Sequence, residues 1–219
     1  MKKNLIFIGM PAVGKSTVGI VVAKRLGMKF IDTDLLIQEQ EGKLLREIIA
    51  ECGEDGFLEI ENRVNASVRA ENSVISPGGS VIYCREAMEH YKKIGTVVYL
   101  QASYQTIRKR IRNPKKRGVV LREGQTLRDL YDERVPYFEK YADITVCEDG
   151  CQIEDTIENV LAAVKERRKR QRPAYRKRPG FAKGRNPRKG SQKDAHRRDG
   201  DRNKSVKKGR KPGTERTGK

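Results

Sequence analysis

Residues 5–17 read Leu-Ile-Phe-Ile-Gly-Met-Pro-Ala-Val-Gly-Lys-Ser-Thr, and this stretch decides the fold. Its part from residue 9 to residue 17 matches G-x-x-x-x-G-K-[ST], a loop whose backbone N–H groups surround nucleotide phosphates. The apolar run in front of the loop is typical of a buried parallel strand, and the apolar residues behind it recur at helical spacing. A helix that begins at the loop would direct its N-terminus at the anion. The sequence therefore predicts a phosphate-binding site, since the alternative, a glycine turn with an exposed lysine, would not need this context.

The side chains of this loop predict a nucleotide and a metal ion. Lys15 is expected to reach the β- and γ-phosphates, and the Ser16 hydroxyl is expected to hold Mg²⁺. We expect the nucleotide to be ATP. Its expected contacts within the loop are Gly9, Ala12, Val13, Gly14, Lys15, Ser16 and Thr17.

The charge of the chain is very unevenly distributed. The 219 residues carry a formal net charge of +19, and residues 165–219 alone contain 24 Lys and Arg against 5 Asp and Glu. Residues 171–219 contain Tyr175, Phe181 and Val206 as their only sizeable apolar side chains, too few to offset the chain entropy lost on folding. We therefore predict that the folded domain with the phosphate loop spans residues 1–164, followed over residues 165–219 by the end of the last helix and a disordered Lys/Arg-rich tail.

Strand and helix patterns alternate along the first 170 residues. Short apolar runs predict strands at 5–8, 28–31, 74–76, 96–100 and 144–146. Helical spacing predicts helices behind the loop and at 35–71 (broken at Gly42 and Gly53), 85–91, 103–112, 126–141 and 153–170. Ser103 is a good N-cap for the fourth of these. This alternation is typical of an α/β fold of three layers, with a five-stranded parallel sheet between helices and with the ligands at the carboxyl ends of the strands.

Two aspartates follow the second predicted strand. A small-molecule kinase needs one carboxylate near Mg²⁺ and another that accepts or orients the proton of the attacking hydroxyl. Asp32 and Asp34 have the spacing for both tasks. Either one would also suit the N-cap of the next helix, but beside a phosphate loop we favour the functional interpretation.

Glycines and arginines supply further candidates. Gly78 and Gly79 follow the third predicted strand and would let the backbone approach a ligand closely, although they would also suit a plain turn. Arg110 and Arg117 flank a cationic loop that could close over ATP and neutralise the charge of the transferred phosphoryl group, or could simply be solvated. Arg134 is a candidate anion ligand.

In this order, the motifs resemble those of the shikimate kinases over nearly all of residues 4–164. The resemblance rests on the phosphate loop, Asp-x-Asp, Gly53-Glu54 with Phe57 and Glu61, the glycine pair, Val-Val-Tyr-Leu at 97–100, the arginine-led loop and Arg-x-Pro-x-Phe at 134–138. It implies an ATP- and Mg²⁺-dependent transfer of a phosphoryl group to shikimate.

The resemblance also implies roles for individual residues. Asp34 would contact the substrate hydroxyls and act as the base, and Asp32 would join Ser16 near the metal. Arg110 would lie against the adenine, and Arg117 would be the lid arginine. Gly78 and Gly79 would contact the substrate ring, and Arg134 would bind its carboxylate.

One departure from the family pattern concerns the acceptor. The pattern has an arginine directly after Phe57, where it binds the substrate carboxylate, and this chain has Leu58. Losing a charge-assisted partner costs about 1.5–3 kcal/mol. Arg63, two residues after Glu61 on the same predicted helix, is a candidate replacement. A related kinase for another polyol, sugar acid or hydroxy amino acid is therefore the alternative function. A nucleotide kinase is less favoured, because it would usually need a longer insertion to bind its second nucleotide.

The remaining expectations concern the surroundings of the protein. The basic tail could bind nucleic acid non-specifically, or could have no dedicated partner. No apolar run approaches the roughly 18 residues of a membrane span, and the first run leads directly into the phosphate loop rather than to a cleavage site. Four scattered cysteines without a histidine cluster suggest reduced thiols. We expect a cytoplasmic protein that does not bind membranes and is a monomer.

Overall fold

A parallel five-stranded sheet forms the centre of the protein. The computed structural model describes residues 4–111, 122 and 124–171. Its strands are β1 (Asn4–Ile8), β2 (Lys29–Asp32), β3 (Ser73–Ser76), β4 (Gly95–Gln101) and β5 (Ile144–Cys147). They pair in the order β2-β3-β1-β4-β5, and every pairing is parallel. The predicted α/β fold with five parallel strands is confirmed.

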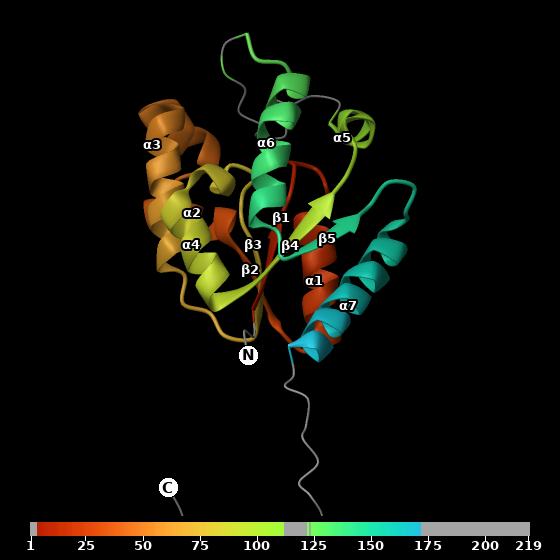
Figure 1. Cartoon of the computed structure of the whole chain (residues 1–219). Coiled ribbons are helices and arrows are strands. Elements are labelled where there is room, and N and C mark those ends of the chain that lie inside the picture. The colour runs from red at the N-terminus through yellow and green to blue at the C-terminus, as the bar shows by residue number, and fades with distance from the viewer. Residues whose placement is uncertain (1–3, 112–121, 123, 172–219) are drawn as a thin grey trace, which may run out of the picture. The chain divides into compact units, whose positions relative to one another are not determined.

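Helices cover both faces of this sheet (Figure 1). They are α1 (Lys15–Leu26), α2 (Thr33–Glu41), α3 (Leu45–Ser67), α4 (Arg85–Ile94), α5 (Tyr104–Arg110), α6 (Leu127–Tyr141) and α7 (Ile153–Arg170), with a short 3-10 helix, η1 (Val81–Tyr83). Helix α1 packs on β1, β2, β3 and α7, while α4 and α6 pack on β4 and α3 packs on α4. The result is the expected arrangement of three layers.

Burial explains why the central strands form. β1 and β3 are buried at every residue, as parallel strands with helices on both faces must be. The largest fully buried side chains include Phe7, Tyr91, Tyr99 and Phe138. The rings of Tyr99 and Phe138 stack with their centroids 5.2 Å apart, which joins β4 to α6. The core therefore holds the carboxyl ends of the strands in fixed positions.

Local signals set most helix ends. The Ser103 side chain accepts a hydrogen bond from the backbone of Thr106, so the predicted N-cap of α5 is confirmed. Thr126 caps α6 in the same way. Helix α5 ends at Arg110, two residues before the predicted end. Gly53 has a φ of 72°, so α3 has a kink there, within what the sequence predicted as two helices.

The last helix is held against the rest of the domain at its C-terminal end. Helix α7 begins beside the carboxyl end of β5 and runs back along the sheet (Figure 1). Near its C-terminus, Arg167 donates hydrogen bonds to the backbone carbonyl and a carboxylate oxygen of Asp143, at 2.9 and 3.0 Å. Asp143 precedes β5 and also binds the backbone of Val97 and the ammonium of Lys92. The tail predicted over residues 171–219 lies almost wholly outside the described residues.

Candidate active site

The phosphate loop connects β1 to α1 and contains backbone that only small or special residues adopt. Gly14 has a φ of 106° at the N-cap of α1, and Ala12 has a φ of 62°. Gly9 approaches the backbone of β4 so closely that a Cβ there would lie 2.6 Å from the carbonyl oxygen of Leu100. The loop is thus folded tightly against the sheet with the N-terminus of α1 directly behind it, the arrangement that binds phosphate.

Lys15 is held by its own loop. Its ammonium donates to the carbonyl oxygens of Gly9 and Met10, at 3.0 and 3.3 Å. Burial lowers the pKa of Lys15 to about 8, and the nearby carboxylate of Asp34 opposes this shift. The cation is thereby placed inside the loop.

Ser16 and Asp32 are brought together as predicted. The Ser16 hydroxyl donates to a carboxylate oxygen of Asp32 at 3.0 Å, and the Ser76 hydroxyl lies 3.4 Å from that of Ser16. Asp32 also accepts from the backbone of Asp34 at 3.1 Å, so it is the N-cap of α2 as well. Hydroxyl and carboxylate oxygens beside a phosphate loop suit Mg²⁺, which commonly binds one or two protein oxygens together with phosphates and waters.

Asp34 lies on α2, next to the phosphate loop. Burial, and secondarily the charge of Asp32, raise its pKa to about 6, while Lys15 opposes the shift. A carboxylate with such a pKa is ionised near neutral pH and still basic enough to accept a proton. The site therefore contains a group suited to general base catalysis.

Glu61 is a member of the site to which the sequence assigned no role. It lies on α3, is fully buried, and its Oε1 has no hydrogen-bond partner among the described residues. Burial raises its pKa to about 7, with a contribution from Asp34, whereas a hydrogen bond with Ser80 and the charge of Arg134 lower it. Its tertiary burial could not be inferred from its neighbours in sequence.

Gly78 lies between the two carboxylates. A Cβ at this position would lie 2.6 Å from Oε1 of Glu61 and 3.0 Å from Oδ1 of Asp34. A Cβ on Gly79 would lie 3.0 Å from Nη1 of Arg134. The glycine pair thus lies between the charged groups, with no room for a side chain at Gly78, and its contact with a ligand stays a prediction.

Arg134 is a buried cation on α6. Only 7% of the residue is exposed, and its guanidinium lies 5.5 Å from the ring centre of Tyr83. None of the ion pairs among the described residues includes Arg134, and its Nε has no hydrogen-bond partner among them. Such a cation is suited to bind an anionic group of a ligand.

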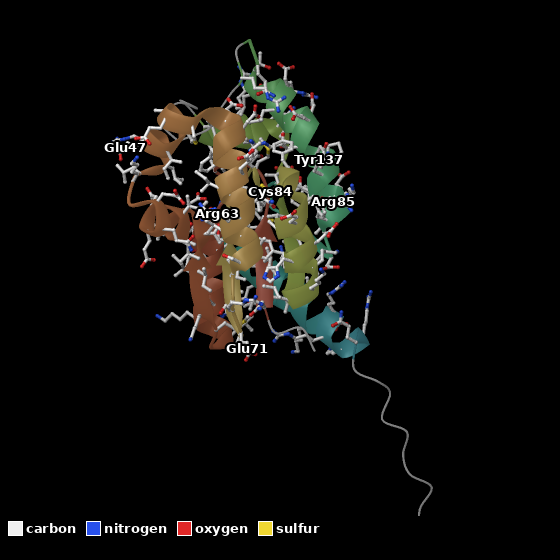
Figure 2. All side chains as sticks on the ribbon, turned by 90° about the vertical axis from the view of Figure 1, so that its left-hand side faces the viewer. Glu47, Arg63, Glu71, Cys84, Arg85 and Tyr137 are labelled. Carbon is white, nitrogen blue, oxygen red and sulfur yellow. The ribbon has the colours of Figure 1, made fainter. Side chains whose placement is uncertain are left out.

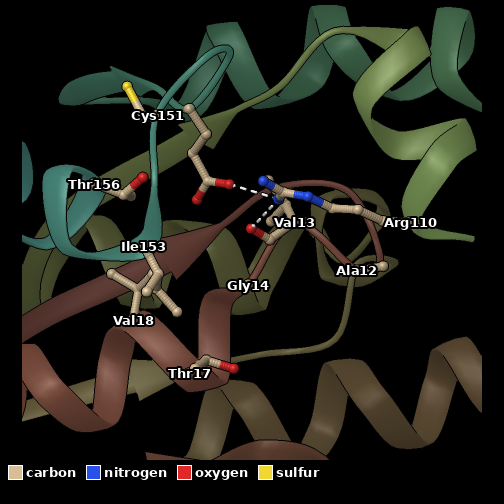
Figure 3. A pocket seen from close by; sticks show the side chains of 10 residues that line it. Ala12, Val13, Gly14, Thr17, Val18, Arg110, Cys151, Ile153 and Thr156 are labelled. Atoms are coloured by element: carbon tan, nitrogen blue, oxygen red, sulfur yellow. Dashed lines mark hydrogen bonds and ion pairs between the residues drawn. The ribbon is translucent and has the colours of Figure 1, made fainter.

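A pocket lies beside the phosphate loop (Figure 3). The loop, Arg110 from the end of α5, and the segment from β5 to α7 surround it. Arg110 donates to the carbonyl oxygen of Val13 at 3.0 Å and to Oε2 of Glu148 at 2.7 Å. The residues that line the pocket are Ala12, Val13, Gly14, Thr17, Val18, Arg110, Glu148, Cys151, Ile153 and Thr156. Four of the predicted loop contacts and Arg110 therefore share one cavity.

The structure shows where Leu58 and its candidate replacement Arg63 lie. Leu58 is partly buried and packs against the main core. Arg63 forms an ion pair with Glu41 at 2.6 Å, with 60% of its side chain exposed, on the outward side of α3 (Figure 2). Arg63 is therefore engaged elsewhere and does not take the place of the missing arginine. Arg117 lies outside the described residues.

The cysteines, the possible metal-ligand groups and the apolar character of the helices were each compared with the expectations from the sequence. All four cysteines, Cys52, Cys84, Cys147 and Cys151, are free. Within the part of the chain that the structure describes, no group of three or more His, Cys, Asp or Glu is placed to hold a metal ion. None of the helices over these same residues has the length and apolar character that crossing a membrane requires.

Comparisons with known proteins agree with this geometry. The model of the shikimate kinase family matches residues 11–180. The shikimate kinase of Sulfurihydrogenibium sp. is 34% identical over 166 residues, which cover 75% of this chain and 99% of that protein. Among solved structures, shikimate kinase from Acinetobacter baumannii in complex with shikimate is similar with a TM-score of 0.68 and 29% identity, over 75% of this chain and 94% of that one. A gluconokinase from Sinorhizobium meliloti shares the fold, with a TM-score of 0.51 and 16% identity over 77% of this chain and 95% of that one.

Proposed function

Because this chain belongs to the shikimate kinase family, we propose that it transfers the γ-phosphoryl group of ATP to a hydroxyl of shikimate, giving shikimate 3-phosphate and ADP. The observation that carries the proposal is the meeting of Lys15, Asp34 and Arg134 in one buried charge cluster. Lys15 and Asp34 each act on the pKa of the other, and the charge of Arg134 contributes to the lowered pKa of Lys15. This cluster contains a cation for the phosphates, a base for the hydroxyl and a cation for the carboxylate of the acceptor.

Each of these residues has a defined part in the transfer. Asp34 orients the acceptor hydroxyl and takes its proton while the hydroxyl oxygen bonds to the γ-phosphorus and the bond to ADP breaks. Lys15 stabilises the negative charge on the phosphoryl oxygens. Arg134 fixes the acceptor through its carboxylate, and Gly78 and Gly79 leave room for the ring.

The nucleotide is held by the loop and by two arginines. Backbone N–H groups of the loop would bind the phosphates, Arg110 would lie against the adenine, and Arg117 would close over the nucleotide. Ser16 and Asp32 would hold Mg²⁺, which neutralises phosphate charge when bound. Location in the cytoplasm, a monomeric state, the division at residue 164 and nucleic-acid binding by the tail stay predictions.

Substituting Asp34 tests this proposal most directly. ADP release is measured with ATP and Mg²⁺, with shikimate compared against a panel of polyols, sugar acids and homoserine. We expect shikimate-dependent turnover in the parent protein, and Asp34→Asn should abolish it while nucleotide binding is retained. Asp55→Asn, which removes an exposed carboxylate on α3, is the matched control and should keep full turnover. Turnover at the parent rate in Asp34→Asn would remove Asp34 from the mechanism, and activity with another acceptor alone would refute shikimate as the substrate.

A further inference from the structure

The buried cation on α6 has an aromatic ring beside it. Arg134 is 7% exposed, and its guanidinium carbon lies over the ring of Tyr83, 5.5 Å from the ring centre. Its Nε has no hydrogen-bond partner among the described residues. A long side chain must be given its direction by its neighbours, because otherwise it loses rotamer freedom when a ligand binds. Tyr83 is the neighbour whose ring can direct Arg134.

Tyr83 is itself held in place by α6. It lies in η1, four residues after Gly79 in the sequence, and its hydroxyl donates to Oε1 of Glu133 at 2.7 Å. The other carboxylate oxygen of Glu133 accepts from Gln125 at 2.9 Å. The ring of Tyr83 also packs edge-on against that of Tyr137, with the two centroids 5.6 Å apart. The ring beside Arg134 therefore has a fixed position.

The hydrogen bond from Tyr83 to Glu133 has two consequences for Arg134. A phenol that donates to a carboxylate has a more electron-rich ring, which attracts a cation on its face more strongly. The same bond engages the carboxylate of the residue that precedes Arg134 on α6 and so keeps this carboxylate from neutralising the guanidinium. The charge of Arg134 is thus left for a ligand in the space near Gly79, where a Cβ would lie 3.0 Å from Nη1.

The direction of this one cation matters more here because a second one is missing. The family pattern has an arginine after Phe57, where this chain has Leu58, which packs against the main core. Arg63 is ion-paired with Glu41 on the outward side of α3. A single guanidinium binds a carboxylate well only if its planar fork is directed before the ligand arrives.

On this basis we propose that Tyr83 is a positioning residue for the acceptor, because the face of its ring directs Arg134 toward the substrate carboxylate. The inference rests on the proposed function in taking Arg134 to bind that carboxylate. It goes further by giving a role to a residue that acts through Arg134. A cation–π contact between buried groups is worth roughly a factor of 5 to 30 in an equilibrium constant, so its loss should be measurable in acceptor binding.

Steady-state kinetics with shikimate and ATP distinguish this role from a merely structural one. Tyr83→Leu removes the ring and should raise the KM for shikimate about tenfold, while kcat and the KM for ATP stay close to the parent values. Tyr83→Phe keeps the ring and should restore most of the lost affinity. Tyr104→Leu is the matched control, because it removes a ring that lies 5.0 Å from an exposed arginine, Arg128, and it should leave all three values unchanged.

The methyl ester of shikimate tests whether the effect passes through Arg134. The ester lacks the negative charge that Arg134 would bind, so Tyr83→Leu should not raise its KM. An equal rise for shikimate and for the ester would mean that Tyr83 only maintains the shape of the site, and this would overturn the proposal. A parent-like KM for shikimate in Tyr83→Leu would overturn it as well, and so would a Tyr83→Phe variant as impaired as Tyr83→Leu.

A measurement without substrate separates this inference from the proposed function. The NMR signal of the Nε–H of Arg134 is identified by its loss in Arg134→Lys. The ring current of residue 83 should displace this signal upfield in the parent and in Tyr83→Phe, but not in Tyr83→Leu. An equal position in all three proteins would overturn the proposal, whereas the displacement without any shikimate turnover would refute only the proposed function. If Tyr83→Leu does not fold, Tyr83→Met, which fills more of the same space, replaces it.

Discussion

Replacing Glu61 with glutamine should stabilise the fold, and it should do so more as the pH rises. Glu61 is fully buried, and its pKa in the folded protein is about 7 against an ordinary value of 4.5, mainly because burial disfavours the charged form. Between these two values the folded state binds more protons than the unfolded state. Stability is therefore greatest below the unfolded pKa and is lost as the pH rises through the folded one. Above about pH 7 the protein must keep a costly buried charge.

The magnitude follows from the two pKa values. Linkage gives a cost of roughly 1 kcal/mol at pH 5, rising to about 3 kcal/mol at pH 8. Glutamine has nearly the same shape and remains neutral, so it removes this pH-dependent part. We therefore expect Glu61→Gln to gain about 2 kcal/mol in the free energy of unfolding at pH 8 relative to its effect at pH 5.

Urea unfolding at the two pH values measures this difference. Glu59→Gln, an exposed substitution on the same helix, is the control and should show no change in effect between pH 5 and pH 8. If the effect of Glu61→Gln were the same at both values, or if the variant lost stability at pH 8, Glu61 would not be a buried group of raised pKa.

Three further predictions concern catalysis. With Asp34 as the base and its pKa at about 6, kcat/KM for the acceptor should rise with pH through this value, and a flat profile between about pH 5 and 8 would exclude it. Gly78→Ala should lower kcat/KM roughly a hundredfold, because its Cβ would displace the carboxylates of Glu61 and Asp34; parent-like kinetics would show that the glycine is not needed for close approach. Leu58→Arg should lower the KM for shikimate about tenfold by adding a charged partner for the carboxylate, and an unchanged KM would show that the position does not contact the acceptor.

Much of the fold could be predicted because its signals are local. The central strands are short apolar runs, and the phosphate loop is a continuous motif between one of them and a helix. Ser103 and Gly42 mark helix ends by their own chemistry. The end of α5 was predicted two residues too late, because the first helix breaker after Arg110 in the sequence is Pro114, which would allow the helix to continue to Arg112.

The candidate site was predictable only where a motif or a family pattern covers it. Ser16 and Asp32, 16 residues apart, meet as expected because a loop and a strand end share one edge of the sheet. The pair of Arg110 and Glu148 was not predicted, since the contact joins α5 to the segment after β5 and leaves no local pattern. The direction of Arg63 also depends on packing, because its partner lies on another helix.

The contacts that hold the C-terminal end of α7 determine how this protein tolerates attachment to a surface or to a fusion partner. Ile153 in its first turn lines the pocket beside the phosphate loop, whereas Arg167 near its last turn is hydrogen-bonded to Asp143 at the amino end of β5. Ile153 and Arg167 are about 21 Å apart along the helix axis. A load coupled just after the helix therefore pulls against Asp143 and the sheet before it reaches the pocket, which makes this end a favourable point of attachment.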